Sequence, residues 1–262
     1  MGHPGDWPLR FSELVEGFLN LVFPARTACY GCGRPLGEPG FLCRGCYREM
    51  RRPFSRVCSR CGKPFLQAGL CGECREEPRY FELSRSLGLY RGVLKKCLYR
   101  LKYGGQEFLG KPLGEMMGGL VLEGVLGERR IDVVVPVPLH RQRRRQRGFN
   151  QAEVLARAVA NRVEAYLSTH WLVREKTTPP LSQASRGERR VLLAGAFRLA
   201  EGVHREVLGK RVLLVDDIFT TGATLNECAR VLLGGGAAQV FGLTAAIGAQ
   251  DGDQNHLSTP EK

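Results

Sequence analysis

The segment with the most specific chemistry in the chain begins with two adjacent carboxylates. Asp216 and Asp217 follow the run 211–215, which is apolar after Arg211, and precede the sequence Ile-Phe-Thr-Thr-Gly-Ala-Thr. Such a run predicts a buried parallel strand, and ligands of α/β sheets bind at the carboxyl ends of strands. A turn that enters a helix offers unpaired N–H groups and a positive dipole end, which suit a phosphate. Gly222 permits a close approach of the backbone to such a phosphate, and Thr220, Thr221 and Thr224 add hydroxyl donors.

The same loop also has a purely structural interpretation as a plain strand–turn–helix connection. That interpretation explains the glycine and the threonines, but it does not explain two aspartates at the end of a strand. Neighbouring carboxylates repel each other, whereas they suit the hydroxyls of a diol or a hydrated divalent cation such as Mg²⁺. The loop is therefore predicted to bind a phosphate beside a diol or a metal.

Cysteines form a second chemical pattern, because eight of the ten fall into Cys-x-x-Cys pairs. Two similar copies begin with Cys-Tyr-Gly-Cys-Gly-Arg-Pro and Cys-Ser-Arg-Cys-Gly-Lys-Pro. Each copy supplies four thiolates for one tetrahedral Zn²⁺, and a repeat of about thirty residues is too short to bury a core without a metal. We expect metal removal to unfold residues 29–74 and to leave the rest largely intact. The predicted ligands of two structural zinc ions are Cys29, Cys32, Cys43 and Cys46, then Cys58, Cys61, Cys71 and Cys74.

Cysteines in such pairs also have other uses. Disulfides need an oxidising compartment, and a redox site needs only one Cys-x-x-Cys pair. Glycine after Cys32 and Cys61 favours a zinc knuckle, although an iron–sulfur centre and an interleaved pairing of the thiolates stay open. The remaining cysteines, Cys97 and Cys228, lie in apolar helical patterns and are predicted core residues.

Basic residues outnumber acidic ones by 39 to 26, which gives a formal net charge of +13. They are clustered, and clusters of this kind suit polyanions such as substrate phosphates or a nucleic-acid backbone. A solvated surface explains any single cluster equally well. The candidate nucleic-acid contacts are Arg143, Arg144, Arg145, Arg147, Lys95 and Lys96.

The amino-terminal segment 9–23 has apolar residues at helical spacing and predicts an amphipathic helix. We expect it to pack on its own protein, with a membrane or partner surface as the alternative. Glu13 and Glu16 within this stretch argue against a secretory signal. Since no apolar run approaches the ~18 residues of a membrane span, the sequence predicts a cytoplasmic protein without a transmembrane segment.

Alternating strand and helix patterns predict an α/β fold with a doubly wound parallel sheet. Strands are expected at 131–135, 171–173, 211–215 and 240–246, and helices at 93–101, 106–122 (interrupted by Pro112), 151–163 and 225–233. Residues 75–85 have the composition of a linker, and 174–190 that of a long loop. The predicted organisation is a lead-in at 1–28, a double zinc ribbon at 29–76, the sheet domain at 85–247 and a disordered tail at 248–262.

The loop 216–224 resembles the phosphoribosyl pyrophosphate motif of type I phosphoribosyltransferases. The stretch 136–156 is similar to the signature of the competence protein ComF family, in which a cysteine-rich zinc finger precedes a phosphoribosyltransferase-like domain. The likeness continues through Tyr-Arg-Gly-Val-Leu-Lys-Lys-Cys-Leu-Tyr-Arg-Leu-Lys-Tyr-Gly-Gly at 90–105 and covers nearly the whole chain from 29 to 247.

This resemblance assigns roles to individual residues. Asp216 and Asp217 would hold the ribose 2′- and 3′-hydroxyls, and Mg²⁺ would accompany the ligand. The 5′-phosphate would bind at Phe219, Thr220, Thr221, Gly222, Ala223 and Thr224. Pyrophosphate would bind at the loop after the first core strand and at a flexible hood. Its candidate ligands are Pro138, Leu139, His140, Arg141 and Arg189.

The resemblance implies two alternative functions. In the first, the protein binds phosphoribosyl pyrophosphate or a related nucleotide and handles single-stranded DNA during natural transformation, with competence-machinery proteins as partners. In the second, it is an active transferase that moves phosphoribose to an unidentified nitrogen acceptor, and no catalytic residue is assigned. One departure concerns the hood, where Leu192 stands in place of the asparagine that the family commonly carries before Gly-Ala-Phe.

Overall fold

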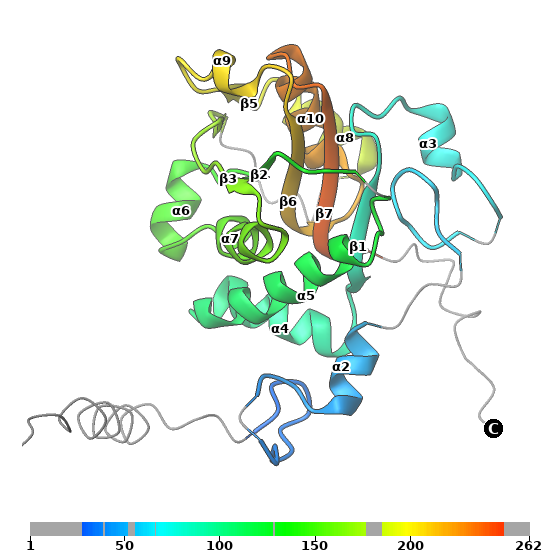
Figure 1. Cartoon of the computed structure of the whole chain (residues 1–262), viewed down its shortest axis with the longest axis vertical. Coiled ribbons are helices and arrows are strands. Elements are labelled where there is room, and N and C mark those ends of the chain that lie inside the picture. The colour runs from blue at the N-terminus through cyan, green and yellow to red at the C-terminus, as the bar shows by residue number, and fades with distance from the viewer. Residues whose placement is uncertain are drawn as a thin grey trace, which may run out of the picture. The chain divides into compact units, whose positions relative to one another are not determined.

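A five-stranded parallel sheet organises the larger part of the chain (Figure 1). Its strand order is β1–β7–β6–β2–β3, and every neighbouring pair is parallel. The alternation of strands and helices that predicted a parallel sheet is confirmed. The strands are β1 (Ser84–Leu89), β2 (Val133–Pro136), β3 (Tyr166–Leu167), β6 (Arg211–Phe219) and β7 (Gln239–Ile247).

The computed structural model describes residues 28–38, 40–51, 56–65, 67–127, 129–176 and 185–248. They divide into two compact units, Met1–Glu49 and Met50–Lys262. The predicted helix at 9–23 and the tail beyond Gly248 lie outside the described residues. Within the described residues, every helix is too short or too polar to cross a lipid bilayer.

Helices of the larger unit cover the sheet with apolar faces. α7 packs against α5, β2 and β6, whereas α10 packs against β6 and β7. The predicted core cysteines Cys97 and Cys228 are fully buried. The helices are α3 (Gly72–Glu76), α4 (Gly92–Tyr103), the 3₁₀ turn η1 (Glu107–Leu109), α5 (Gly110–Leu122), α6 (Arg141–Arg147), α7 (Gln151–Val163), α8 (Arg186–Leu193), α9 (His204–Val207) and α10 (Ala223–Gly234); α2 (Arg44–Met50) ends the smaller unit and enters the larger one.

A small second sheet differs from the sequence-based expectation. The predicted strand at 171–173 is observed as β4 (Leu172–Arg174), but it pairs antiparallel with β5 (Phe197–Leu199) and not with the main sheet. The main sheet instead gains β1 and the two-residue β3 at its edges. The sequence pattern did not predict β1 because residues 84–89 begin with three polar residues and contain a glycine, so that tertiary pairing with β7 decides their conformation.

Three local predictions were wrong for identifiable reasons. Pro112 does not interrupt a helix, since it lies in the first turn of α5, where its missing N–H has no helical partner to lose. Part of the predicted loop 174–190 is α8, which begins at a capping box formed by Ser185 and Glu188. β6 continues past Val215 to Phe219 and carries both aspartates within the strand.

Candidate functional site

The two aspartates lie in the last part of β6, at the carboxyl edge of the sheet. They line a pocket of about 870 Å³ together with residues of α4, α6, α7, β4 and α8. β6 lies between β2 and β7, so the pocket opens above the middle of the sheet and not at a side. This is the position at which parallel α/β sheets bind ligands.

Asp217 forms an ion pair that links the strand to α4. Its Oδ2 lies 2.8 Å from Nζ of Lys102, and both side chains are more than four-fifths buried. Burial lowers the pKa of Lys102, but the charge and hydrogen bond of Asp217 more than offset this and the net shift is upward. Lys102 therefore stays charged, and it places one fixed cation beside the carboxylates.

The environment of Asp216 disfavours its charged form, whereas that of Lys102 favours the charged form. Removal from water and the neighbouring charge of Asp217 raise its pKa to about 7, although the Asp217 N–H donates to Asp216 Oδ1 at 2.8 Å and Lys102 and Arg174 act in the other direction. Near neutral pH this carboxyl is partly protonated. A ligand diol or a divalent cation would stabilise its ionised form.

This shift predicts how stability depends on pH. An acid whose pKa rises from 3.8 to about 7 on folding lowers the free energy of unfolding as pH increases through that interval. Asp216→Asn should remove this penalty and stabilise the ligand-free protein at pH 8 by about 2 kcal/mol, which is less than the full shift implies because the pocket is open to water. Denaturant unfolding at pH 5 and pH 8 measures the effect.

Asp132 provides the matched control for this experiment. Arg211 hydrogen-bonds to it and lowers its pKa to about 2, so Asp132→Asn should destabilise the protein at both pH values. Equal stability of Asp216→Asn and the unmodified chain at pH 8 would contradict the environment described for Asp216.

The loop between β6 and α10 has the geometry of a phosphate cradle. Gly222 precedes α10 at φ +76°, and a Cβ there would lie 2.4 Å from the ring of Phe219. Only glycine fits both the left-handed backbone and this ring. Thr220 and Thr224 line the pocket, while the Thr221 hydroxyl accepts the N–H of Ala223 at 3.3 Å.

Cationic side chains line the same pocket as the carboxylates. Arg147 donates to Gln151 Oε1 at 2.8 Å, and its guanidinium lies 5.2 Å from the centre of the Tyr103 ring. Gln151 is buried at the pocket, and its Nε2 has no hydrogen-bond partner among the described residues. That amide is a donor suited to a ligand oxygen. The arginines that line the pocket are Arg143, Arg147, Arg174 and Arg189.

The pyrophosphate candidates from the sequence occupy different places. Pro138, Leu139 and Arg189 line the pocket, whereas the structure places His140 and Arg141, both described, outside that lining. Helix α6 begins at Arg141, and His140 caps it by accepting the Gln142 N–H at 3.3 Å. From α6 itself, Arg143, Gln146 and Arg147 line the pocket instead.

Sequence reasoning did not assign Lys102, Arg174 or Gln151 to the site. Lys102 and Gln151 lie within the stretches that resemble the ComF family, so that resemblance was a usable signal for both. Arg174 is 7% exposed and comes from β4 of the small sheet. No local pattern marks it, since only the tertiary fold brings β4 to the pocket.

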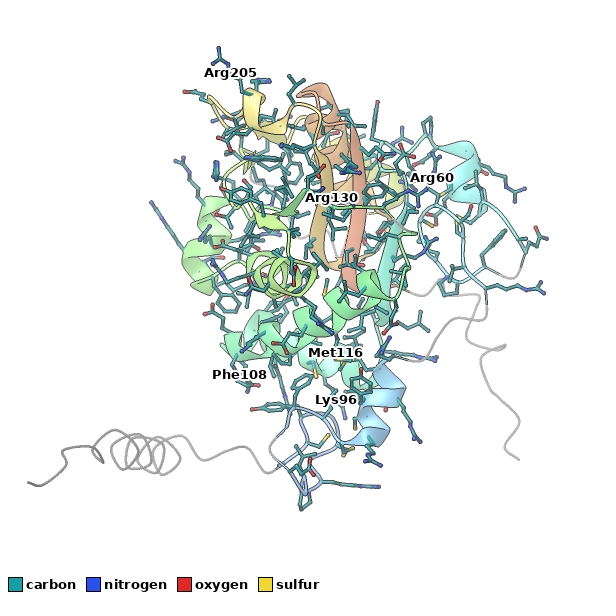
Figure 2. The ribbon with its side chains drawn as sticks, in the orientation of Figure 1. Arg60, Lys96, Phe108, Met116, Arg130 and Arg205 are labelled. Carbon is teal, nitrogen blue, oxygen red and sulfur yellow. The ribbon has the colours of Figure 1, made fainter. Side chains whose placement is uncertain are left out.

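The candidate nucleic-acid contacts separate into two groups. Lys95 and Lys96 are exposed on α4 (Lys96 is labelled in Figure 2), and Arg145 is exposed on α6. Arg144 is exposed as well and pairs with Glu153 at 3.1 Å. In contrast, Arg143 and Arg147 line the pocket.

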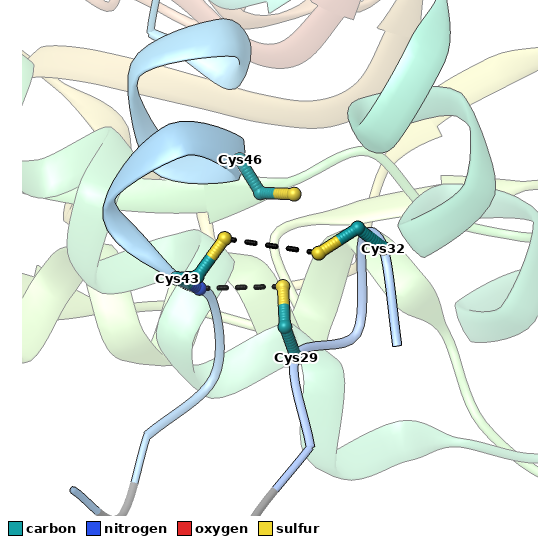
Figure 3. Close-up of side chains that lie close together, drawn as sticks. All are labelled: Cys29, Cys32, Cys43 and Cys46. Atoms are coloured by element: carbon teal, nitrogen blue, oxygen red, sulfur yellow. Dashed lines mark hydrogen bonds between the residues drawn. The ribbon is translucent and has the colours of Figure 1, made fainter. Parts of the chain in front are cut away.

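Both cysteine sets have the chemistry of structural zinc sites. Within each set the four Sγ atoms lie within 4.8 Å of one another, in the sequential arrangement and not the interleaved one. In the first set, Cys43 N–H donates to Cys29 Sγ at 3.2 Å (Figure 3). In the second set, Cys71 N–H donates to Cys58 Sγ at 3.3 Å. The first set is Cys29, Cys32, Cys43 and Cys46, and the second set is Cys58, Cys61, Cys71 and Cys74.

Comparisons with known proteins match the cysteine-rich part of the chain and the sheet-forming part separately. A family model described as a double zinc ribbon domain matches residues 18–75, and one described as a phosphoribosyl transferase domain matches residues 150–257. DNA utilization protein YhgH of Salmonella typhimurium is 31% identical over 220 residues, which cover 81% of this chain and 93% of that protein. Competence protein F of Haemophilus influenzae is 30% identical over 211 residues, 78% of this chain and 90% of the relative.

More distant relatives and solved structures extend the comparison. Competence protein ComFC of Bacillus subtilis is 27% identical over 203 residues, 75% of this chain and 80% of the relative. The allosteric regulatory enzyme of purine biosynthesis has 20% identity and a TM-score of 0.36 over 52% of this chain and 26% of its own. A hypoxanthine phosphoribosyltransferase from Staphylococcus aureus has 16% identity and a TM-score of 0.30, and the match covers 56% of this chain and 68% of that structure's chain. With TM-scores this low, the family models and the sheet topology carry the fold assignment.

Proposed function

We propose a function for this chain, which belongs to the family of competence protein F and DNA utilization protein YhgH. Its pocket binds phosphoribosyl pyrophosphate with Mg²⁺, and the protein handles single-stranded DNA. The observation that supports the first part is the Asp216–Asp217 pair at the end of β6, directly before a glycine turn into α10. Paired cysteine thiols that serve as metal ligands require a reducing compartment, so we place this activity in the cytoplasm.

Each part of the ligand has a chemically suited partner in the pocket. The two carboxylates accept hydrogen bonds from a ribose diol, and Thr220 and Thr224 face a 5′-phosphate at the start of α10. The pocket arginines Arg143, Arg147, Arg174 and Arg189 suit pyrophosphate. Mg²⁺ would neutralise part of the phosphate charge when bound.

A thermal-shift titration of the full chain tests the ligand assignment. Phosphoribosyl pyrophosphate with Mg²⁺ should raise the melting temperature by mass action, as any ligand of the native state does. Ribose without phosphates is the control and should leave the melting temperature unchanged. Absence of a shift at millimolar ligand would rule out the proposed donor site.

Transfer of the phosphoribosyl group is a second candidate function, favoured by the aromatic side chains beside the carboxylates. Tyr90, Tyr103 and Phe149 line the same pocket and could stack on a planar acceptor. Pyrophosphate release that requires an added nitrogen nucleophile would establish a transferase. Binding without release would leave the binding role.

The proposed nucleic-acid function predicts a salt effect that arises from α6. Single-stranded DNA should bind with little sequence preference, and its affinity should fall steeply with salt. Replacing Arg144 and Arg145 with alanine should flatten the plot of log K against log salt by about 0.7 for each phosphate that the protein no longer neutralises. Fluorescence anisotropy at several salt concentrations gives this slope.

The control replaces Arg205, an exposed arginine on α9 (Figure 2), with alanine. This variant should keep the slope of the unmodified chain. If the Arg144/Arg145 variant also keeps it, α6 is not the DNA surface, and α4 with Lys95 and Lys96 becomes the next surface to test.

A further inference from the structure

The second cysteine set is attached to the sheet through the loop between its first two thiols. Ser84 N–H, at the start of β1, donates to the Arg60 carbonyl at 2.7 Å, and Arg85 Nη2 donates to the Ser59 carbonyl at 3.1 Å. Gly62 has φ +73°, and a Cβ there would lie 2.6 Å from the Ser84 carbonyl oxygen. Figure 2 shows Arg60 on this loop beside β1. The metal-binding loop and the first residues of β1 therefore form one packed structure.

Three buried charged side chains also connect the second cysteine set to the segment that follows it. Glu73 Oε1 lies 2.7 Å from Lys63 Nζ, and Glu73 Oε2 lies 3.7 Å from Arg79 Nη2. All three side chains are more than nine-tenths buried. Separating buried partners of this kind is strongly unfavourable, so the turn that carries the last two thiols is tied to residues 77–81.

Residues 77–81 then contact three segments that carry pocket residues. Tyr80 N–H donates to Asn226 Oδ1 in α10 at 2.7 Å. Glu77 pairs at 2.8 Å with Arg190 on α8, the neighbour of the pocket residue Arg189. The connecting segment of the second cysteine set thus reaches the helix that follows the phosphate loop and the helix that carries a pocket cation.

The third contact lies beneath the phosphate loop itself. Phe81 is 1% exposed, and its ring meets that of Phe219 edge-on, with centres 6.2 Å apart and planes at 84°. Phe219 is also the ring against which Gly222 packs. The second-set thiols belong to the same buried core as Phe81 and Phe219. A displacement of Phe81 would therefore be transmitted to the loop that cradles the phosphate.

We infer that the metal of the second cysteine set positions the phosphate loop through residues 77–81, so that phosphoribosyl affinity depends on this set and not on the first. The ligand in this statement rests on the proposed function, whereas the coupling between the cysteine set and the loop does not. Phe81 and Glu77 act here as positioning residues, since neither lines the pocket.

Amide hydrogen exchange in the ligand-free protein tests the coupling without any ligand. Exchange of residues 219–226 should become faster in Cys71→Ser and in Phe81→Leu, by on the order of tenfold for local opening of a loop that loses its support. Cys43→Ser in the first set is the matched control and should leave these amides unchanged. Because Cys71→Ser can unfold the larger unit, Phe81→Leu, which keeps both cysteine sets, gives an independent answer.

A charge reversal gives a readout that a general loss of packing would not produce. Arg190→Glu should weaken binding of phosphoribosyl pyrophosphate with Mg²⁺, whereas Arg190→Lys should retain it, because lysine keeps the ion pair with Glu77. Phe81→Leu should weaken binding on the order of tenfold, since displaced positioning groups cost affinity for a ligand held at many points.

The outcomes separate this inference from the proposed function. If the unmodified chain fails to bind phosphoribosyl pyrophosphate, the proposed function fails, and the exchange experiment still decides the coupling. Unchanged exchange at 219–226 in folded Cys71→Ser and Phe81→Leu would overturn the inference, and so would an equal effect of Cys43→Ser.

Discussion

Replacing both pocket aspartates, with Asp216→Asn and Asp217→Asn in one chain, is expected to weaken binding of phosphoribosyl pyrophosphate on the order of 100-fold or more. Each variant removes a charged acceptor for a ribose hydroxyl, and such hydrogen bonds contribute about 1.5–3 kcal/mol each. Since about 1.4 kcal/mol corresponds to a factor of ten, the loss of two bonds gives this range. Isothermal titration with Mg²⁺ present measures the change directly.

The control is Asp132→Asn, which removes a paired carboxylate at the opposite end of the same strands. It should lower stability and leave ligand affinity unchanged. Asp216→Asn should do the reverse, since relief of the buried charge raises ligand-free stability while binding is lost. If the double variant binds as tightly as the unmodified chain, the carboxylates do not hold the ligand.

Removing zinc is expected to produce the largest loss of stability. Structural zinc ions bind zinc-finger peptides with about 10–16 kcal/mol, and that binding free energy is folding free energy. The purified protein should contain two zinc ions per chain, as two complete sets of four thiols imply. Elemental analysis and thermal unfolding with and without a chelator measure the stoichiometry and the stability loss.

The sequence-based expectation that chelation leaves the sheet domain largely intact needs correction. The second cysteine set lies in the larger unit, and its thiols share the buried core with Phe81, Leu89 and Phe219. Chelation should therefore also lower the melting temperature of the sheet. Cys97→Ala, which changes a core thiol outside both sets, should keep two zinc ions. One zinc ion per chain, or iron in its place, would contradict the double-ribbon assignment.

The features that the sequence determined by itself are local. The run 211–224 places a strand, two aspartates, a glycine turn and a helix start in immediate succession, so their proximity follows from chain connectivity alone. The cysteine sets were equally predictable, because each repeat contains its own four thiols. α7 was predicted at its observed bounds, since its apolar spacing is a local signal.

Tertiary structure alone decided the parts that depend on distant segments. β1 has no strand-like pattern in its first half and is a strand because β7 pairs with it. Arg174 reaches the pocket only because β4 joins β5 outside the main sheet. Lys102 became the partner of Asp217 through the packing of α4. The attachment of the second cysteine set to the phosphate loop has the same origin. Contacts between residues far apart in the chain leave no periodic signal in either segment, and their energy appears only when both are packed.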